Sequence, residues 1–220
     1  MTGITIVTGA FGALGRAVVE NLVAKRITVA AVDLAPAPST PLATLDRGGI
    51  DLADPSAVEA CFTEISAAHG PFSGLVNVAG GFIWQTVTDG DIEGWDRMYR
   101  MNLRTAVTAC TKAIPHLNER AAIVSIAAAA TNRPGVGMAA YAASKAGVVA
   151  LTESLAEELR PRRVRVNALL PTIIDTPANR AAMPDADTTG WIAPEDLAEM
   201  VAFLLSDATN CITGSTIRAG

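Results

Sequence analysis

Two side chains with complementary acid–base chemistry stand four residues apart in the sequence, at Tyr141 and Lys145. Small and apolar residues recur at helical spacing through residues 141–159, so both side chains are expected on one side of a helix, one turn apart. An ammonium group beside a phenol favours the phenolate and is expected to lower the tyrosine pKa from its ordinary value of about 10. Such a phenol can donate or accept a proton near neutral pH. The plainer alternative is a surface tyrosine and a solvated lysine, and the rest of the chain has to decide between the two.

A glycine-rich turn near the start of the chain predicts a dinucleotide site. The β-branched residues 4–7 predict a buried strand, residues 8–15 read TGAFGALG, and residues 16–25 have helical periodicity. Glycines between a strand and a helix let the backbone approach a pyrophosphate, to which the helix N-terminus offers N–H groups and a positive dipole. Gly9, Gly12 and Gly15 are the candidates for this role.

An acidic residue, Asp33, ends the second predicted strand, residues 27–32. A carboxylate at this place would accept hydrogen bonds from both adenosine ribose hydroxyls and would repel a 2′-phosphate. The sequence therefore favours NAD(H) over NADP(H) as the cofactor. The alternative role for Asp33 is to cap the loop that follows it.

The rest of the chain alternates strands with helices. Further strands are expected at residues 49–52, 75–81, 121–127, 164–170 and 215–218, and further helices at residues 54–69, 91–117 (interrupted near Asn102) and 194–205. Residues 35–44 are expected to form a loop, and residues 171–194 an irregular segment. This order predicts one α/β domain over residues 1–220, a Rossmann-type doubly wound parallel sheet of about seven strands with helices on both faces.

Composition argues against several classes of function. The net charge is −5 and no basic run stands out beyond residues 160–165, which gives a nucleic-acid partner little support. The most apolar run, residues 121–130, is too short to span a bilayer, and the first residues lack a secretory signal pattern. Three cysteines without metal-type spacing predict reduced thiols and no metal site. We therefore expect a cytoplasmic protein that acts on a small molecule, with no membrane and no nucleic acid as partners.

These features occur together in the short-chain dehydrogenase/reductase family, which the chain resembles over nearly its whole length. The matching pieces are TGAFGALG at residues 8–15, Asp33, Asp51 with Leu52, NVAG at 77–80, Asn102, YAASK at 141–145, and Pro171 with Thr176. The resemblance implies hydride transfer between a nicotinamide cofactor and a carbonyl, imine or alcohol carbon. It also implies a homodimer or homotetramer, paired through the helices at residues 91–117 and 141–159.

The resemblance assigns roles to individual residues. Tyr141 would be the general acid in reduction, Lys145 would lower its pKa and bind the nicotinamide ribose, and Asn102 would hold a water that relays protons. Asp51 would contact the adenine, and Asn77, Ala79 and Gly80 would line the adenosine side. The cofactor-binding residues implied are Gly9, Phe11, Gly12, Ala13, Leu14, Gly15, Asp33, Asp51, Leu52, Asn77, Ala79, Gly80, Tyr141, Lys145, Pro171, Thr172, Ile174 and Thr176.

Two positions depart from the family pattern. Ala13 stands where the family has the middle glycine of the phosphate loop, and Ala128 stands where it has a catalytic serine. Ser125 comes too early to replace that serine and is expected to be structural, while Thr131 is an alternative donor if the loop is rearranged. The lost hydroxyl would have donated to the developing alkoxide of a ketone, a contact worth roughly 2.7–4 kcal/mol. A C=N substrate, which becomes a neutral amine, does not need this donor.

Within the family, the chain most resembles the quinonoid dihydropteridine reductases, which also have alanine at the serine position. The pieces are VAGGF at 78–82, RPGVGMAAY at 133–141 and LPTIIDTPANRAAMPDADTTGW at 170–191. This likeness makes residues 171–193 a segment that covers the substrate, and the substrate-binding candidates are Phe82, Trp84, Ala128 and Trp191. Trp84 would stack on a flat ring or be an ordinary loop aromatic. The expected substrate is a quinonoid dihydropteridine or related cyclic imine. The alternatives are a general ketone reductase or secondary alcohol dehydrogenase, and a dinucleotide-sensing protein without turnover.

Overall fold

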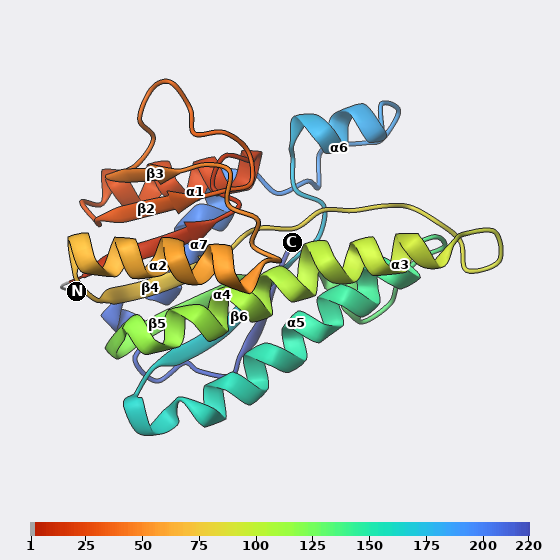
Figure 1. Cartoon of the computed structure of the whole chain (residues 1–220). Coiled ribbons are helices and arrows are strands. Elements are labelled where there is room, and N and C mark those ends of the chain that lie inside the picture. The colour runs from red at the N-terminus through yellow and green to blue at the C-terminus, as the bar shows by residue number, and fades with distance from the viewer. Residues whose placement is uncertain (1–2) are drawn as a thin grey trace.

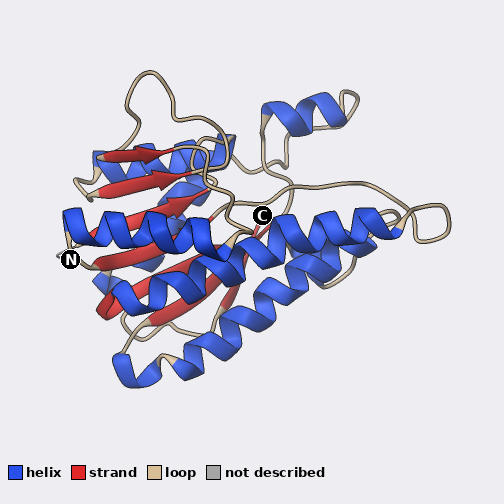
Figure 2. Cartoon of the chain, viewed as in Figure 1, coloured by secondary structure: helices blue, strands red, loops and turns tan. Residues whose placement is uncertain are grey.

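A seven-stranded parallel sheet forms the centre of the computed structural model, which describes residues 3–220 (Figure 2). Its strands are β1 (Ile4–Thr8), β2 (Val29–Val32), β3 (Leu45–Arg47), β4 (Phe72–Asn77), β5 (Leu117–Ile126), β6 (Arg165–Pro171) and β7 (Thr216–Ala219). The order across the sheet is β3-β2-β1-β4-β5-β6-β7, and every pairing is parallel. The expected fold class is confirmed, and the first two residues of the expected domain lie outside the described part.

Helices cover both faces of this sheet (Figure 1). Helices α1 (Ala13–Ala24) and α7 (Pro194–Leu205) pack together on one face, and α2 (Pro55–His69), α4 (Thr105–Ala113) and α5 (Ala139–Glu158) cover the other. Successive strand residues point to opposite faces, so Ile6 joins the core under α2 and α4, whereas its neighbour Val7 joins the core under α1 and α7. Parallel strands buried on both faces explain the long apolar runs of the sequence.

The shorter helices lie mostly in the connections. They are α3 (Ile92–Met98), the π-helix η1 (Tyr99–Arg104), α6 (Pro177–Ala182) and the 3₁₀ helices η2 (Ile114–His116), η3 (Ala129–Thr131), η4 (Arg160–Arg162) and η5 (Asp207–Thr209). The helix expected over residues 91–117 is therefore four segments, and the predicted interruption near Asn102 is the π-helix. The segment expected to be irregular, residues 171–194, contains α6, which lies beyond the sheet (Figure 1).

The third strand was placed wrongly by the sequence pattern. It covers residues 45–47 rather than 49–52 and pairs with β2 at the edge of the sheet. Asp46, inside the strand, holds the turn that precedes it, because its carboxylate accepts hydrogen bonds from the N–H groups of Leu42 and Ala43. The strand has three half-buried residues, so it carries no apolar run that a pattern could detect.

The strand order changes direction between β1 and β4, which are neighbours although β2 and β3 separate them in sequence. In open α/β sheets, ligands bind in the crevice at the carboxyl ends of the strands at such a reversal. No helix within residues 3–220 is both long enough and apolar enough to cross a membrane.

Candidate functional site

The three glycines after β1, Gly9, Gly12 and Gly15, have different structural roles. Gly9 has a left-handed backbone, with φ of 63°, and a Cβ there would lie 2.6 Å from the backbone of Ala79. Gly15 lets α1 pack on the loop, because a Cβ there would collide with the carbonyl oxygen of Gly9. Gly12 is open: a Cβ there would meet a single atom, at 3.6 Å. Gly12 is also the N-cap of α1 and makes no side-chain cap, so this end of the helix is free to face a ligand.

A shallow cleft borders this helix end. Its volume is about 400 Å³, and its lining residues are Ala13, Asp175, Thr176, Pro177, Arg180, Ala193, Pro194 and Glu195. Thr176 caps α6 by accepting from the Asn179 N–H, at 3.2 Å. The cleft thus lies between the glycine-rich loop and the start of α6, and it brings together two predicted cofactor-binding residues, Ala13 and Thr176. The other predicted contacts of this segment are structural in the described residues: Pro171 ends β6, the Thr172 N–H donates to Ala219, and Ile174 bridges Ile192.

Asp33 lies directly against the glycine turn. Its Oδ2 accepts from the N–H of Phe11, at 2.8 Å, and its Oδ1 accepts from the N–H of Ala35, at 2.9 Å. The carboxylate therefore caps its own loop, as the alternative interpretation expected, and also fixes the phosphate loop. A carboxylate oxygen accepts more than one hydrogen bond, so both oxygens keep capacity for ribose hydroxyls.

Residues 80–82, after β4, contact all three predicted catalytic side chains. A Cβ at Gly80 would lie 3.1 Å from Nζ of Lys145 and 2.6 Å from Oδ1 of Asn102. The Phe82 ring packs edge to face on the Tyr141 ring, with centroids 5.1 Å apart. Residues from β4, the π-helix and α5, far apart in sequence, thus converge at the carboxyl end of the sheet.

The acid–base state of the tyrosine differs from the sequence prediction. Burial raises the pKa of Tyr141 to about 12 and lowers the pKa of Lys145 to about 8. Lys145 is 5% exposed, and its Nζ donates to the carbonyl oxygen of Ile126, at 2.8 Å. The expectation that Lys145 lowers the tyrosine pKa is wrong, because burial raises the pKa of Tyr141 and also lowers the pKa of Lys145. The phenol is protonated at neutral pH.

Asn102 is buried at 1% exposure and makes a fixed set of contacts. Its Oδ1 accepts from the Gly81 N–H, at 2.9 Å, and its Nδ2 donates to Gly81 O, at 3.1 Å, and to Ser144 Oγ, at 3.0 Å. Ser144 in turn donates to the carbonyl oxygen of Tyr141, at 2.7 Å. The side chain of Asn102 therefore holds residues 80–82 against α5. Sequence reasoning missed Ser144, although it lies inside the YAASK motif.

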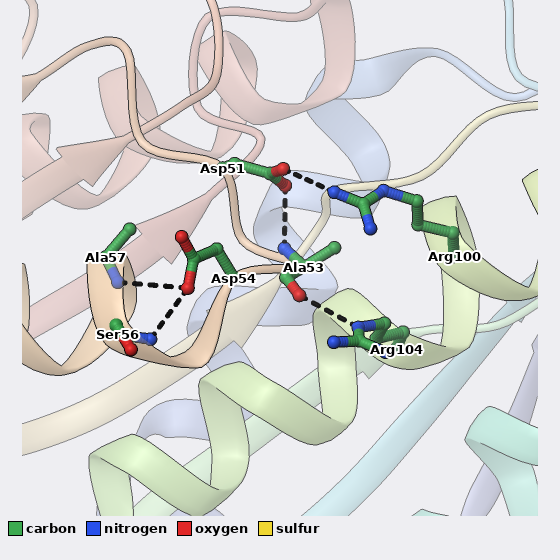
Figure 3. A network of polar contacts seen from close by, with 7 residues as sticks. All are labelled: Asp51, Ala53, Asp54, Ser56, Ala57, Arg100 and Arg104. Atoms are coloured by element: carbon green, nitrogen blue, oxygen red, sulfur yellow. Dashed lines mark hydrogen bonds and ion pairs between the residues drawn. The ribbon is translucent and has the colours of Figure 1, made fainter.

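The π-helix η1 is also tied to the loop after β3 (Figure 3). Arg100 pairs with Asp51, at 2.6 Å, and the Nε of Arg104 donates to Ala53 O, at 2.8 Å. Asp51, predicted to contact adenine, also accepts from the Ala53 N–H, at 2.9 Å. These contacts join the predicted adenine side to the helix that carries Asn102. Sequence analysis did not identify the two arginines, because nothing in their spacing distinguishes them from surface charges.

Ala128, at the position where the family pattern has a serine, is a buried methyl group. Ala128 is 4% exposed, between β5 and η3. Thr131, the alternative donor, gives its hydroxyl hydrogen to Ala128 O, at 2.9 Å. Ser125 is buried within β5 and accepts from Nδ2 of Asn77, at 3.2 Å, which is the structural role expected of it.

Several predicted contact residues lie away from this convergence. Asn77 is 4% exposed and bonds to Ser125 and Cys110 inside the protein. Leu52 and Leu14 belong to the hydrophobic cores. The Trp84 indole N–H donates to Val136 O, at 3.0 Å, and its ring lies against Gly137, so Trp84 links two loops. Trp191 is half-buried, and its backbone N–H donates to Thr188 O. Within residues 3–220, no group of three or more His, Cys, Asp or Glu side chains could hold a metal ion.

Comparisons with known proteins show relatives of this chain in sequence and in fold. A family model described as enoyl-(acyl carrier protein) reductase matches residues 9–219. The chain is 32% identical to 3β-hydroxysteroid dehydrogenase 1 of Eggerthella lenta, covering 96% of this chain and 90% of that protein. It is 31% identical to 3-oxoacyl-(acyl-carrier-protein) reductase of Escherichia coli, covering 98% and 94%. The crystal structure of 3-ketoacyl-(acyl-carrier-protein) reductase from Brucella melitensis complexed with NADH superposes with a TM-score of 0.87, at 27% identity, covering 99% and 96%.

Proposed function

The chain belongs to the short-chain dehydrogenase/reductase family of NAD(P)-dependent oxidoreductases, and we propose that it reduces a ketone, or oxidises the corresponding secondary alcohol, of a small molecule. The observation that carries the proposal is the meeting of Tyr141, Lys145 and Asn102 at residues 80–82, at the carboxyl end of the sheet. The relatives named above act on hydroxysteroid and 3-oxoacyl groups, and their names support carbonyl chemistry over the pterin assignment.

The residues present fit a dinucleotide. The space beside Gly12 is free, whereas backbone atoms lie close to Gly9 and Gly15. The N-terminus of α1 has no side-chain cap. Gly12, Ala13 and Thr176 would hold the pyrophosphate, Asp33 the adenosine ribose, and Lys145 the nicotinamide ribose. When bound, the nicotinamide supplies or accepts the hydride. The negative charge of Asp33 would repel a 2′-phosphate, so we propose NAD(H) as the preferred cofactor.

Tyr141 is suited to donate the proton in reduction. Its phenol is protonated at neutral pH, and burial raises its pKa further, to about 12. In the reduction direction the phenol O–H donates to the substrate oxygen, and in the oxidation direction the phenolate accepts a proton from the alcohol. Phe82 orients the phenol by packing on its ring. Asn102 keeps residues 80–82 in place, and we propose that the segment 171–193 covers the substrate.

Ala128 supports a second candidate function, the reduction of a cyclic imine or a quinonoid dihydropteridine. A buried methyl group cannot donate to an alkoxide, and the Thr131 hydroxyl is already used within its turn. An imine nitrogen needs a proton from Tyr141 but no second donor.

A substrate panel separates these candidates. NADH oxidation is measured with β-keto esters, cyclic ketones, cyclic imines and a quinonoid dihydropterin, for the unmodified protein and for Ala128→Ser. Carbonyl reduction is expected in the unmodified protein, and Ala128→Ser should raise kcat/KM for ketones about a hundredfold or more while leaving imines nearly unchanged. Turnover of imines alone would contradict the ketone proposal, and equal gains for both classes would show that another donor serves the oxygen.

We also propose that the protein is a homo-oligomer that pairs through α3, η1 and α4. Ile92, Tyr99, Met101 and Val107 are exposed along this helical stretch at 71%, 51%, 39% and 39%. Light scattering should give a mass of two or four chains, and Tyr99→Glu with Val107→Glu should reduce it. A monomer in the unmodified protein would contradict the pairing.

A further inference from the structure

A second cleft lies at the opposite end of the sheet from the site described above. Its volume is about 420 Å³, and its lining residues are Arg120, Arg160, Arg163, Val164, Arg165, Asn210 and Thr213. It forms where η4 leads into β6, next to the loop between η5 and β7. Figure 1 shows that α5 ends, and β6 begins, far from α6.

The lining of this cleft is strongly basic. It contains four arginines and no acidic residue, on a chain whose net charge is −5. Arg160 pairs with Glu157 outside the cleft. The side chains of Arg120 and Arg163 are exposed and have no hydrogen-bond or ion-pair partner within residues 3–220. Like charges gathered in one cleft repel, and an anion would relieve that repulsion.

Arg165 gives the cleft a fixed floor. It is 5% exposed, and its two Nη atoms make four hydrogen bonds, to Leu204 O, Leu205 O, Ser206 O and Thr209 Oγ1, at 2.6 to 3.1 Å. A guanidinium has five N–H donors. The fifth, at Nε, is buried and has no partner among the described residues. A buried donor without an acceptor costs about 1–3 kcal/mol, and the positive charge of Arg165 lies at the floor of the cleft.

We propose that this arginine cleft binds a diphosphate group. Guanidinium groups bind phosphate oxygens with two parallel hydrogen bonds, and they hold this geometry better than lysines do. Three exposed arginines around a buried fourth match an anion with several charges, and the volume suits a ligand larger than one phosphate. Both free diphosphate and a nucleoside diphosphate present this chemistry.

The test measures binding of inorganic pyrophosphate by calorimetry, with saturating NADH and without it, at physiological ionic strength. One site per chain is expected in both conditions, because the cleft is remote from the nucleotide-binding loop. Arg163→Gln and Arg163→Gly should each weaken binding roughly tenfold or more, the loss expected for one charge-assisted contact. The glycine variant guards against misfolding, since Arg163 has a left-handed backbone, with φ of 56°, which glycine adopts without strain.

Arg26→Gln is the matched control. Arg26 is also an exposed arginine with a left-handed backbone, φ 62°, but it does not line the cleft. Unchanged binding in Arg26→Gln supports the site, and an equal loss in both variants overturns it, since that would show unspecific attraction of charge. Absence of any pyrophosphate binding with NADH bound, or unchanged binding in the Arg163 variants, also overturns it. ADP binding more tightly than pyrophosphate would assign the site to a nucleoside diphosphate, and equal affinities would assign it to the free anion.

Discussion

The burial of Lys145 lowers the free energy of unfolding by an amount that depends on pH and can therefore be measured. Its folded-state pKa is about 8, against an ordinary value of 10.5. Between these values the unfolded chain binds the lysine proton more tightly than the folded protein does, so the free energy of unfolding rises with pH. Below pH 8 the burial cost is nearly constant. From pH 7 to pH 9.5 the gain from this lysine is about 2 kcal/mol, from 1.36 kcal/mol per pKa unit.

Lys145→Met removes this titration. Urea unfolding of both proteins is followed at pH 7 and pH 9.5, and the difference in free energy of unfolding, unmodified minus variant, is expected to increase by about 2 kcal/mol. Cys61 and Cys110 are buried, with pKa values raised to about 11 and 12, and they lower stability above pH 9. They do so in both proteins and cancel in the difference. Lys25→Met, at an exposed ion pair with Glu199, controls for the loss of one ammonium group. A difference in the free energy of unfolding that stays constant with pH would refute the lowered pKa of Lys145.

Two further predictions concern the cofactor loop. Gly12→Val should raise the NADH dissociation constant at least about tenfold with little change in Tm, because the valine side chain fills the open approach to the loop. Gly15→Ala should instead destabilise the fold by about 2 kcal/mol, because its methyl group meets the Gly9 carbonyl. Equilibrium titration measures NADH binding and thermal melts measure stability, and equal destabilisation by the two substitutions would contradict the different roles of these glycines. Asp33→Ala should reduce the preference for NADH over NADPH about tenfold in kcat/KM. It should also lower stability, because the N–H groups of Phe11 and Ala35 lose their acceptor. An unmodified protein that prefers NADPH would contradict the proposed role of Asp33.

The sheet could be predicted because each long strand carries a buried apolar run between turn residues. β3 was missed, since its three residues are held by Asp46 and by pairing with β2 rather than by burial. The interruption near Asn102 was anticipated, but its π-helical form depends on tertiary contacts, such as those of Arg100 and Arg104 with the loop after β3.

The placement of Tyr141 and Lys145 on one helix could be predicted from the sequence, but their pKa values could not. Tyr141 and Lys145 stand where the spacing placed them, on one helix. Their pKa values depend on how deeply α5 is buried and on the Ile126 carbonyl that accepts from Lys145, and neither follows from a four-residue spacing. Trp84 shows the same limit, because its bond to Val136 depends on a loop fifty residues away in the chain.

The proton donated by Tyr141 is the step on which the proposed reaction depends. The most direct measurement compares Tyr141→Phe with the unmodified protein, in NADH affinity by fluorescence titration and in steady-state reduction of the best ketone from the panel. We predict that the variant binds NADH within about twofold of the unmodified protein and loses roughly a hundredfold or more in kcat, the usual contribution of a positioned general acid. A variant that keeps its turnover would show that the tyrosine is not the acid and would contradict the account.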